Sequence, residues 1–209
     1  MRRFTAEDFD NKTNFFDQMA ASSWFIRLQD ETCRNLSGEE LLDSGCGTGR
    51  LAARLRQFQH RVGIDLSSEM IREAKQLHHG ESGLTFLQAD VEKLPFPDEQ
   101  FDAVISTCVL FLLPEPDRAL SEWFRVQRRG GELRLLNPAP GFSSARAEQD
   151  ALQLPDKERN GLLQWGRIAE RRHRFSEAEL ERKLTAAGYQ EVEVRLSACK
   201  RATIAAAIK

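Results

Sequence analysis

The spacing of apolar residues along the chain changes near residue 40. Residues 1 to about 37 interleave aromatic and aliphatic side chains with charged and amide residues, a pattern typical of amphipathic helices. From Glu40 onward, short apolar runs alternate with segments whose apolar residues recur every three to four positions. We therefore expect an N-terminal helical cap, residues 1–37, followed by a domain of alternating strands and helices, residues 38–209.

Short apolar runs mark the expected parallel strands, and amphipathic helical patterns separate them. The runs are residues 41–43, 62–65, 84–89, 101–106 and 132–136. In the first intervening helix, Leu51, Leu55 and Phe58 share one face. The next two helices have apolar faces made of Met70, Ile71, Ala74 and Leu77, and of Ala119, Leu120, Trp123 and Phe124. Because crossovers between parallel strands are right-handed, this order predicts a mainly parallel sheet with helices on both faces.

The last third of the chain is less regular. Residues 138–174 contain several prolines and glycines between short helical stretches, and we expect an insertion over the carboxyl edge of the sheet. Residues 176–179 form a capping box that starts a helix, and Gly188 is placed to end it. Residues 191–196 and 202–208 then read as two strands joined by a short connection, which predicts an antiparallel hairpin at the end of the sheet.

The turn after the first strand is rich in glycine. Its sequence is Asp43-Ser44-Gly45-Cys46-Gly47-Thr48-Gly49, and Arg50 stands where a dinucleotide-binding turn has its third glycine. The Gly-Lys-Ser/Thr ending of a phosphate-binding loop is also missing. This spacing favours a nucleoside ligand without phosphate, such as S-adenosylmethionine, whose α-amino group Asp43 can hold. The alternative is a turn that only lets a helix pack closely on a strand.

Two further acidic residues end the next two strands. Asp65 can accept hydrogen bonds from both ribose hydroxyls, and Asp90 can accept one from the adenine amine, with Val91 on the purine face. Ligands of open α/β sheets bind beyond the carboxyl ends of strands, so these side chains are expected to meet. Taken singly, Asp65 could belong to a helix N-cap and Asp90 to a turn; together with the glycine turn they predict one adenosyl ligand.

These motifs resemble those of the class I S-adenosylmethionine-dependent methyltransferases, and in particular the small-molecule subset called type 11. The similar segments are residues 41–49, 63–67, 89–97, 101–104, 125–131 and 175–189. The resemblance implies a Rossmann-like, open, twisted, seven-stranded sheet with an antiparallel last strand. It also implies that the glycines lie near the methionine part of the donor, and that Thr107 and Cys108 line its site. The chain departs from the family at Ser44, at Arg128-Arg129 and at Phe111, where a histidine or tyrosine is common.

The expected donor site is therefore a set of residues from four strand ends. It consists of Asp43, Ser44, Gly45, Cys46, Gly47, Gly49, Asp65, Leu66, Met70, Asp90, Val91, Thr107 and Cys108. Its cofactor is S-adenosylmethionine, which leaves as S-adenosylhomocysteine. The sulfonium is already activated, so a general base is needed only if the acceptor must lose a proton.

On the acceptor side, His173 is the candidate base, and a solvated histidine is the alternative. It lies in a basic run with Arg171, Arg172 and Arg174. This run is either a solvated face or a binding site for a carboxylate or phosphate of the acceptor. The N-terminal aromatics and the insertion are the expected acceptor lid. Trp24, Phe25 and Trp165 could shape an apolar pocket there, or could simply belong to the core.

Composition narrows the function further. The formal net charge is −2, so no global field attracts nucleic acid or anionic membrane. No apolar run approaches the ~20 residues of a membrane span, and the N-terminus lacks an apolar signal core, which predicts a cytoplasmic protein without a membrane partner. The four cysteines are scattered, so no metal site or redox pair is expected, and a homodimer stays open.

The sequence thus predicts a methyltransferase that acts on a small molecule. The alternatives are a non-enzymatic S-adenosylmethionine- or S-adenosylhomocysteine-binding regulatory protein and a methyltransferase of RNA or protein. Residues 106–109 lack the Asn/Asp-Pro-Pro-aromatic motif of enzymes that methylate adenine amino groups in DNA. The glycine spacing disfavours a nicotinamide-dependent dehydrogenase.

Overall fold

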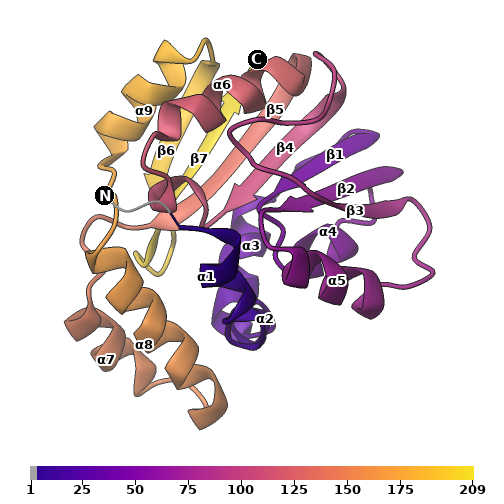
Figure 1. The fold of residues 1–209 in the computed structure, drawn as a ribbon. Coiled ribbons are helices and arrows are strands. Elements are labelled where there is room, and N and C mark those ends of the chain that lie inside the picture. Colours follow the sequence, from indigo (N-terminus) through magenta and orange to yellow (C-terminus); the bar gives the residue numbers. More distant parts are fainter. Residues whose placement is uncertain (1–3) are drawn as a thin grey trace.

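Strands from both halves of the chain form one sheet in the computed structural model, which describes residues 4–209 (Figure 1). The strands are β1 (Glu40–Ser44), β2 (His60–Asp65), β3 (Leu84–Gln88), β4 (Phe101–Thr107), β5 (Gln127–Pro138), β6 (Gln190–Leu196) and β7 (Ala202–Ile208). Their order in this 7-stranded sheet is β3-β2-β1-β4-β5-β7-β6. Strands β1 to β5 pair in parallel, and β7 is antiparallel to both β5 and β6. The predicted Rossmann-like sheet, its antiparallel last strand and the C-terminal hairpin are confirmed.

Helices cover both faces of this sheet, as predicted. The N-terminal helices are α1 (Ala6–Asp10), α2 (Thr13–Ala20) and α3 (Ser23–Thr32). Those of the central part are α4 (Arg50–Arg54), α5 (Ser68–Leu77), the short 3₁₀ helix η1 (Leu110–Leu112) and α6 (Pro116–Val126). The last are α7 (Ser144–Ala151), α8 (Asp156–Glu170) and α9 (Glu177–Ala186). Helices α6 and α9 lie on one face, and α3, α4 and α5 lie on the other (Figure 1).

Alternation along the central strands explains this layering. Leu42 and Val104 are buried in the core that also contains Trp123 of α6 and Leu180 of α9. Their chain neighbours point the other way: Leu41, Ala103 and Ile105 are buried with Leu51 of α4. Since successive side chains of a strand point to opposite faces, a strand that is apolar at every position needs a helix layer on each side.

The observed elements differ from the predicted ones at several ends. Helix α4 stops at Arg54, so Leu55 and Phe58 are buried from the turn that follows it and not from a continuous helix face. The chain has little room for more helix, because β2 already begins at His60. Leu77, predicted on the apolar face of α5, is the last residue of that helix, and its side chain is 45% exposed. Strand β5 begins at Gln127, before Gly130, where the backbone turns with φ +75°.

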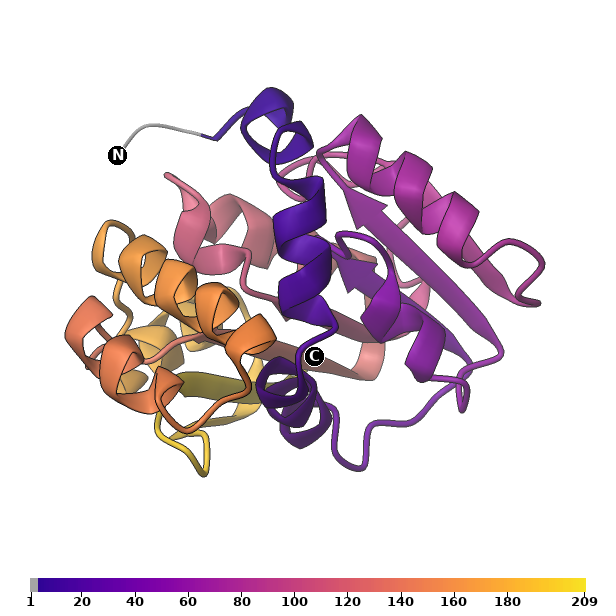
Figure 2. The ribbon, with the colours of Figure 1, turned by 90° about the horizontal axis from the view of Figure 1, so that it is seen from below.

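The N-terminal helices and the insertion lie at the carboxyl ends of the parallel strands. Helix α1 packs against α5 and α2 against α8, and in Figure 2 these helices lie between the α7–α8 pair and α5. Trp165 of α8 contacts Cys108, the residue after β4. Residues 1–3 of the expected cap lie outside the described part of the chain. Within residues 4–209, no helix combines the length and the apolar character that crossing a bilayer would require.

Candidate functional site

A pocket opens at the carboxyl ends of β1, β2 and β4, beneath α1 and α2. It encloses about 1030 Å³ of empty space, including solvent at its mouth. We call it the central pocket. Most of the residues predicted for the donor site line it. They are Gly45, Cys46, Gly47, Asp65, Leu66, Met70, Asp90, Val91, Thr107 and Cys108. The carboxyl ends of the parallel strands thus bring together, at one pocket, side chains that lie far apart in the sequence.

Three of the predicted residues do not reach the wall of this pocket. The side chain of Ser44 points into the core, where its Oγ accepts a hydrogen bond from Trp123 Nε1 at 2.8 Å. A Cβ on Gly49 would lie 2.4 Å from the ring of Phe86, so this glycine allows close packing of α4 on the sheet. Asp43 is 1% exposed. Asp43, Ser44 and Gly49 are thus the predicted site residues that the structure does not bring to the pocket wall.

The buried Asp43 carboxylate is left without a good partner. Neither of its oxygens makes a well-aligned hydrogen bond within residues 4–209. Burial raises the pKa of Asp43 to about 7, and the nearby negative charge of Asp65 adds to this, while the backbone of Ala52 and the charge of Arg54 lower it. An orphaned buried carboxylate is costly, and a nearby cation would relieve that cost.

Asp65 joins the glycine turn to the start of α5. Its Oδ2 accepts a hydrogen bond from Gly47 N at 2.9 Å, and its Oδ1 accepts one from Ser67 N at 3.0 Å. Ser67, not Asp65, is the N-cap of α5, because its Oγ accepts from Met70 N at 3.0 Å. Burial raises the pKa of Asp65, although the backbone N–H groups of Ser67 and Gly47 lower it. Each Asp65 oxygen accepts one of these two hydrogen bonds, and a carboxylate oxygen has two lone pairs.

Gly45 and Gly47 of the turn differ in what an added side chain would meet. At Gly45, with φ +84°, a Cβ would lie 2.1 Å from Val109 Cγ2, so the turn is pressed against the segment after β4. At Gly47, with φ +55°, no atom lies within 4 Å of the Cβ position. Since Gly47 also lines the central pocket, its backbone is open to whatever fills that space.

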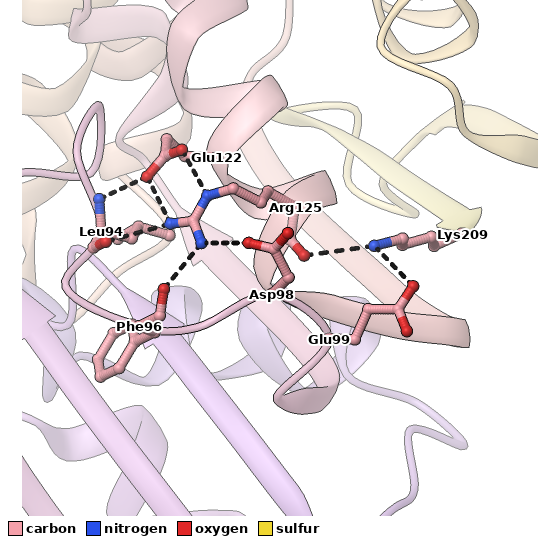
Figure 3. A network of polar contacts seen from close by, with 7 residues as sticks. All are labelled: Leu94, Phe96, Asp98, Glu99, Glu122, Arg125 and Lys209. Atoms are coloured by element: carbon pink, nitrogen blue, oxygen red, sulfur yellow. Dashed lines mark hydrogen bonds and ion pairs between the residues drawn. The ribbon is translucent and has the colours of Figure 1, made fainter.

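Arg125 of α6 binds the loop that follows Asp90 (Figure 3). The guanidinium donates to the carbonyls of Phe96, at 2.8 Å, and Leu94, at 3.1 Å. It also pairs with both oxygens of Glu122, one of which accepts from Leu94 N at 2.7 Å. The hydrogen bonds to Glu122 and to Asp98 raise the pKa of Arg125. The sequence assigned Arg125 no role of its own, since two of its partners are backbone carbonyls of a loop that is distant in the sequence.

Acidic residues of the N-terminal helices fasten these helices over the pocket. Asp17 of α2 accepts hydrogen bonds from Thr48 Oγ1, at 2.6 Å, and from Arg50 Nε, at 2.7 Å. These bonds outweigh burial and lower the pKa of Asp17. Asp10 of α1 accepts from Ser67 Oγ at the start of α5. The glycine turn and the helix that carries Met70 are thus both tied to the cap, a link that the helical pattern of the cap could not reveal.

The aromatic residues of the cap and insertion divide between pocket and core. Phe25 lines the central pocket, whereas Trp24 is 3% exposed and packs on Trp165, with 5.4 Å between ring centroids. His173 does not reach the central pocket. It lines a separate hollow near Pro116, and its ring stacks on Phe175 at 5.2 Å between centroids. The stacking and the backbone hydrogen bond from His173 N to Phe111 O hold it there, so the predicted base is not beside the donor site.

The thiols are free, and two of them belong to the central pocket. Cys46 and Cys108 lie on its wall, and burial raises the pKa of both. Cys108 has φ +62°, a left-handed conformation that is uncommon for a residue with a side chain. It turns the chain out of β4 and places Thr107 and Val109 at the pocket.

Together these features describe a site for a cationic nucleoside. Asp43 and Asp65 form a buried acidic pair on two sides of the glycine turn, and Asp90 also lines the pocket. Phe9, Phe16 and other apolar side chains of the cap close it from above. Such a site can bind a positive group near the turn, hold hydroxyls at Asp65 and exclude water.

Sequence comparison finds a methyltransferase domain in residues 42–135. A phosphatidylethanolamine N-methyltransferase of Cereibacter sphaeroides is 40% identical over 110 residues, covering 49% of this chain and 52% of that protein. A fatty-acid O-methyltransferase of Mycolicibacterium smegmatis is 35% identical over 124 residues, covering 58% of this chain and 45% of that protein. The chain therefore spans about half the length of these relatives.

Solved structures agree over nearly the whole chain. A Haloferax volcanii methyltransferase in complex with the Trm112 methyltransferase activator has a TM-score of 0.74 at 18% identity, with 98% of this chain and 97% of that chain covered. An S-adenosylmethionine-dependent methyltransferase of Thermotoga maritima has a TM-score of 0.70 at 20% identity, with 96% and 97% covered. Residues 42–135 therefore form a methyltransferase domain, and the chain has the fold of the class I S-adenosylmethionine-dependent methyltransferases.

Proposed function

We propose that this protein transfers a methyl group from S-adenosylmethionine to a small-molecule acceptor. The observation that carries the proposal is the buried acidic pair Asp43 and Asp65 at a glycine turn whose Gly47 faces open space. Because burial raises the pKa of both carboxyls, a cation in the pocket would stabilise their ionised forms, which favours a ligand with ammonium and sulfonium charges over a phosphate-bearing dinucleotide. The two relatives described above are both methyltransferases, which supports the same reaction.

Each part of the donor has a matching group on the pocket wall. The backbone of Gly45 and Gly47 suits the methionine part, with Asp43 acting on its positive charge through space. Asp65 suits the ribose hydroxyls, and Asp90 with Val91 suits the adenine. Leu66, Met70, Thr107 and Cys108 complete the wall around the nucleoside and the sulfonium.

The chain contributes mainly by binding and positioning. S-adenosylmethionine, when bound, supplies an already activated methyl group. Phe9, Phe16 and Met19 of the cap exclude water from the reacting region. The walls orient donor and acceptor for an in-line approach, and such orientation can supply much of the rate enhancement.

Substitution of Asp65 tests the donor assignment. In Asp65→Ala we expect the affinity for S-adenosylmethionine and S-adenosylhomocysteine to fall about 10- to 100-fold, as the loss of charge-assisted hydrogen bonds predicts. Isothermal titration calorimetry measures it. The matched control is Asp156→Ala, at an 89% exposed side chain of α8, which should bind as the wild type does. Equal affinity in Asp65→Ala and wild type would discredit the ribose assignment.

A metabolite screen tests the transfer reaction itself. The purified protein is incubated with S-adenosylmethionine and candidate acceptors, and S-adenosylhomocysteine release is the readout. Donor binding without release for any small molecule, RNA or protein would instead indicate a regulatory binding protein.

The proposal includes a cytoplasmic location and an acceptor that is not nucleic acid. Four free cysteines, with no disulfide among them, support a reducing compartment. Fractionation of cells tests the location, and sedimentation velocity distinguishes a monomer from a homodimer.

A further inference from the structure

A second, apolar cavity adjoins the central pocket under the cap. We call it the aromatic chamber; it lies between α1–α2 and α8 and encloses about 390 Å³ of empty space, solvent included. Phe9, Phe16, Met19, Cys108 and Leu112 line both cavities, so only one layer of side chains separates them. A molecule in this chamber would therefore lie next to the proposed donor.

The accessible surface of the chamber is almost entirely carbon and sulfur, although Asp8 and Lys12 are among its lining residues. Phe111 and Trp165 are 2% exposed and form its inner side. The indole N–H of Trp165 has no nitrogen or oxygen acceptor within residues 4–209; its neighbour is the thiol of Cys108. The chamber thus suits an apolar group, with one buried donor available for an oxygen atom.

The outer end of the chamber meets a hollow lined by cations. We call it the basic hollow; it shares Phe4, Lys12 and Ile168 with the chamber and adds Arg167, Arg171 and Arg172. No carboxylate lines it. The guanidinium of Arg172 lies 3.7 Å from the centroid of the Phe4 ring, which fixes it at the edge of the hollow.

Several of these cations make no ion pair. Lys12, Arg167 and Arg171 are exposed, and none of them has a carboxylate oxygen within ion-pair distance among residues 4–209, although the charge of Arg171 helps to lower the pKa of Glu170. Most other arginines of the described chain pair with a carboxylate, as Arg50, Arg146 and Arg195 do. A group of unpaired cations at the mouth of an apolar cavity is complementary to an anion attached to an apolar body.

We propose that the acceptor is a small amphipathic anion, with its apolar part in the aromatic chamber and its carboxylate, phosphate or sulfate group in the basic hollow. This inference rests on the proposed function and narrows it to a substrate class. The apolar part is the portion that approaches the donor and carries the nucleophilic atom that bonds to the methyl group as the bond from methyl to sulfur breaks, and the anion sets its direction of entry.

Binding of ten-carbon amphiphiles tests this, in the presence of saturating S-adenosylhomocysteine and below their aggregation concentrations. Isothermal titration calorimetry compares decanoate, decyl phosphate, 1-decanol and decyltrimethylammonium, with inorganic phosphate as the headgroup alone. We expect both anions to bind at least tenfold more tightly than the cation, 1-decanol to lie between them, and phosphate alone to be the weakest anion. Equal affinity for anion and cation would overturn the proposal.

Variants then assign the two parts of the ligand. In the double variant Arg167→Gln/Arg171→Gln we expect decanoate affinity to fall about tenfold and 1-decanol affinity to stay the same. The control Arg27→Gln/Arg182→Gln removes two exposed arginines elsewhere and should change neither. In Ile168→Gln, both ligands should weaken, because the apolar part loses its contact. Unchanged decanoate binding in either pocket variant would contradict the assignment.

The same titrations separate this inference from the proposed function. S-adenosylhomocysteine affinity is measured first in every variant, and we expect it to stay at the wild-type value. If S-adenosylhomocysteine does not bind even to the wild type, the proposed function fails. If it binds but the amphiphiles show no preference for negative charge, the function stands and the acceptor class is wrong.

Discussion

An added methyl group at Gly45 should destabilise the protein far more than the same change two residues later, at Gly47. In Gly45→Ala the new Cβ would lie 2.1 Å from Val109 Cγ2, and the residue would keep φ +84°. In Gly47→Ala the Cβ meets no atom within 4 Å, and φ is +55°. The two variants therefore share a left-handed backbone but differ in the collision.

The expected magnitudes follow from these two contributions. A left-handed alanine costs about 1–2 kcal/mol, and forcing an extra carbon into a packed site costs about 1–3 kcal/mol more. The free energy of unfolding should thus fall by about 2–5 kcal/mol in Gly45→Ala and by about 1–2 kcal/mol in Gly47→Ala. Urea denaturation followed by circular dichroism measures both.

A double variant isolates the contact with Val109. If the collision is the cause, Val109→Ala removes the atom in the way, and Gly45→Ala/Val109→Ala should be more stable than the sum of the single changes by about 1–3 kcal/mol. Donor titration adds a second readout, because the Gly47→Ala methyl enters the central pocket and should weaken binding in a well-folded protein. A larger loss of stability in Gly47→Ala than in Gly45→Ala, or strict additivity with Val109→Ala, would refute the reasoning.

Three further substitutions probe the surroundings of the pocket. The pKa of Asp43 is about 7 when folded and 3.8 ordinarily, so the native state binds the extra proton, and the stability it confers is lost as pH rises through 7. Asp43→Asn should flatten urea-measured stability across pH 4–7; an unchanged slope would exclude this carboxylate as the source. Arg125→Met should lower the free energy of unfolding by about 1–3 kcal/mol and weaken donor binding, whereas Arg129→Met, at an 88% exposed side chain, should do neither. Asp17→Asn should release the cap and speed S-adenosylhomocysteine dissociation in stopped-flow measurements, with Asp30→Asn as the surface control; equal rates would mean that the cap is not held by Asp17.

Local sequence order determined the succession of strands and helices that forms the sheet. The alternation of apolar runs with helical patterns suffices for the order of strands and helices, because each element must bury one face against the next. The positions of Asp65 and Asp90 followed from the same rule, since parallel strands bring their carboxyl ends to one edge. The C-terminal hairpin was equally predictable, from the alternation of polar and apolar residues over 191–196 and the second strand at 202–208.

Tertiary structure alone decided which of these residues face the pocket. Asp43 and Ser44 belong to the motif but point into the core, because a strand sends successive side chains to opposite faces and both faces here are covered by helices. The role of Gly49 depends on Phe86, which is distant in sequence. His173 was separated from the donor site by its stacking on Phe175.

The contacts that cover the pocket and stabilise its walls also could not be predicted from the sequence. Three features join segments that no local pattern connects. They are the ion pair of Asp17 with Arg50, the hydrogen bonds of Arg125 to the loop after Asp90, and the basic hollow beside the aromatic chamber. Hydrophobic periodicity records which face of an element is buried, but it does not record the partner. Partners are fixed only when the helices of the cap and insertion pack together over the strand ends.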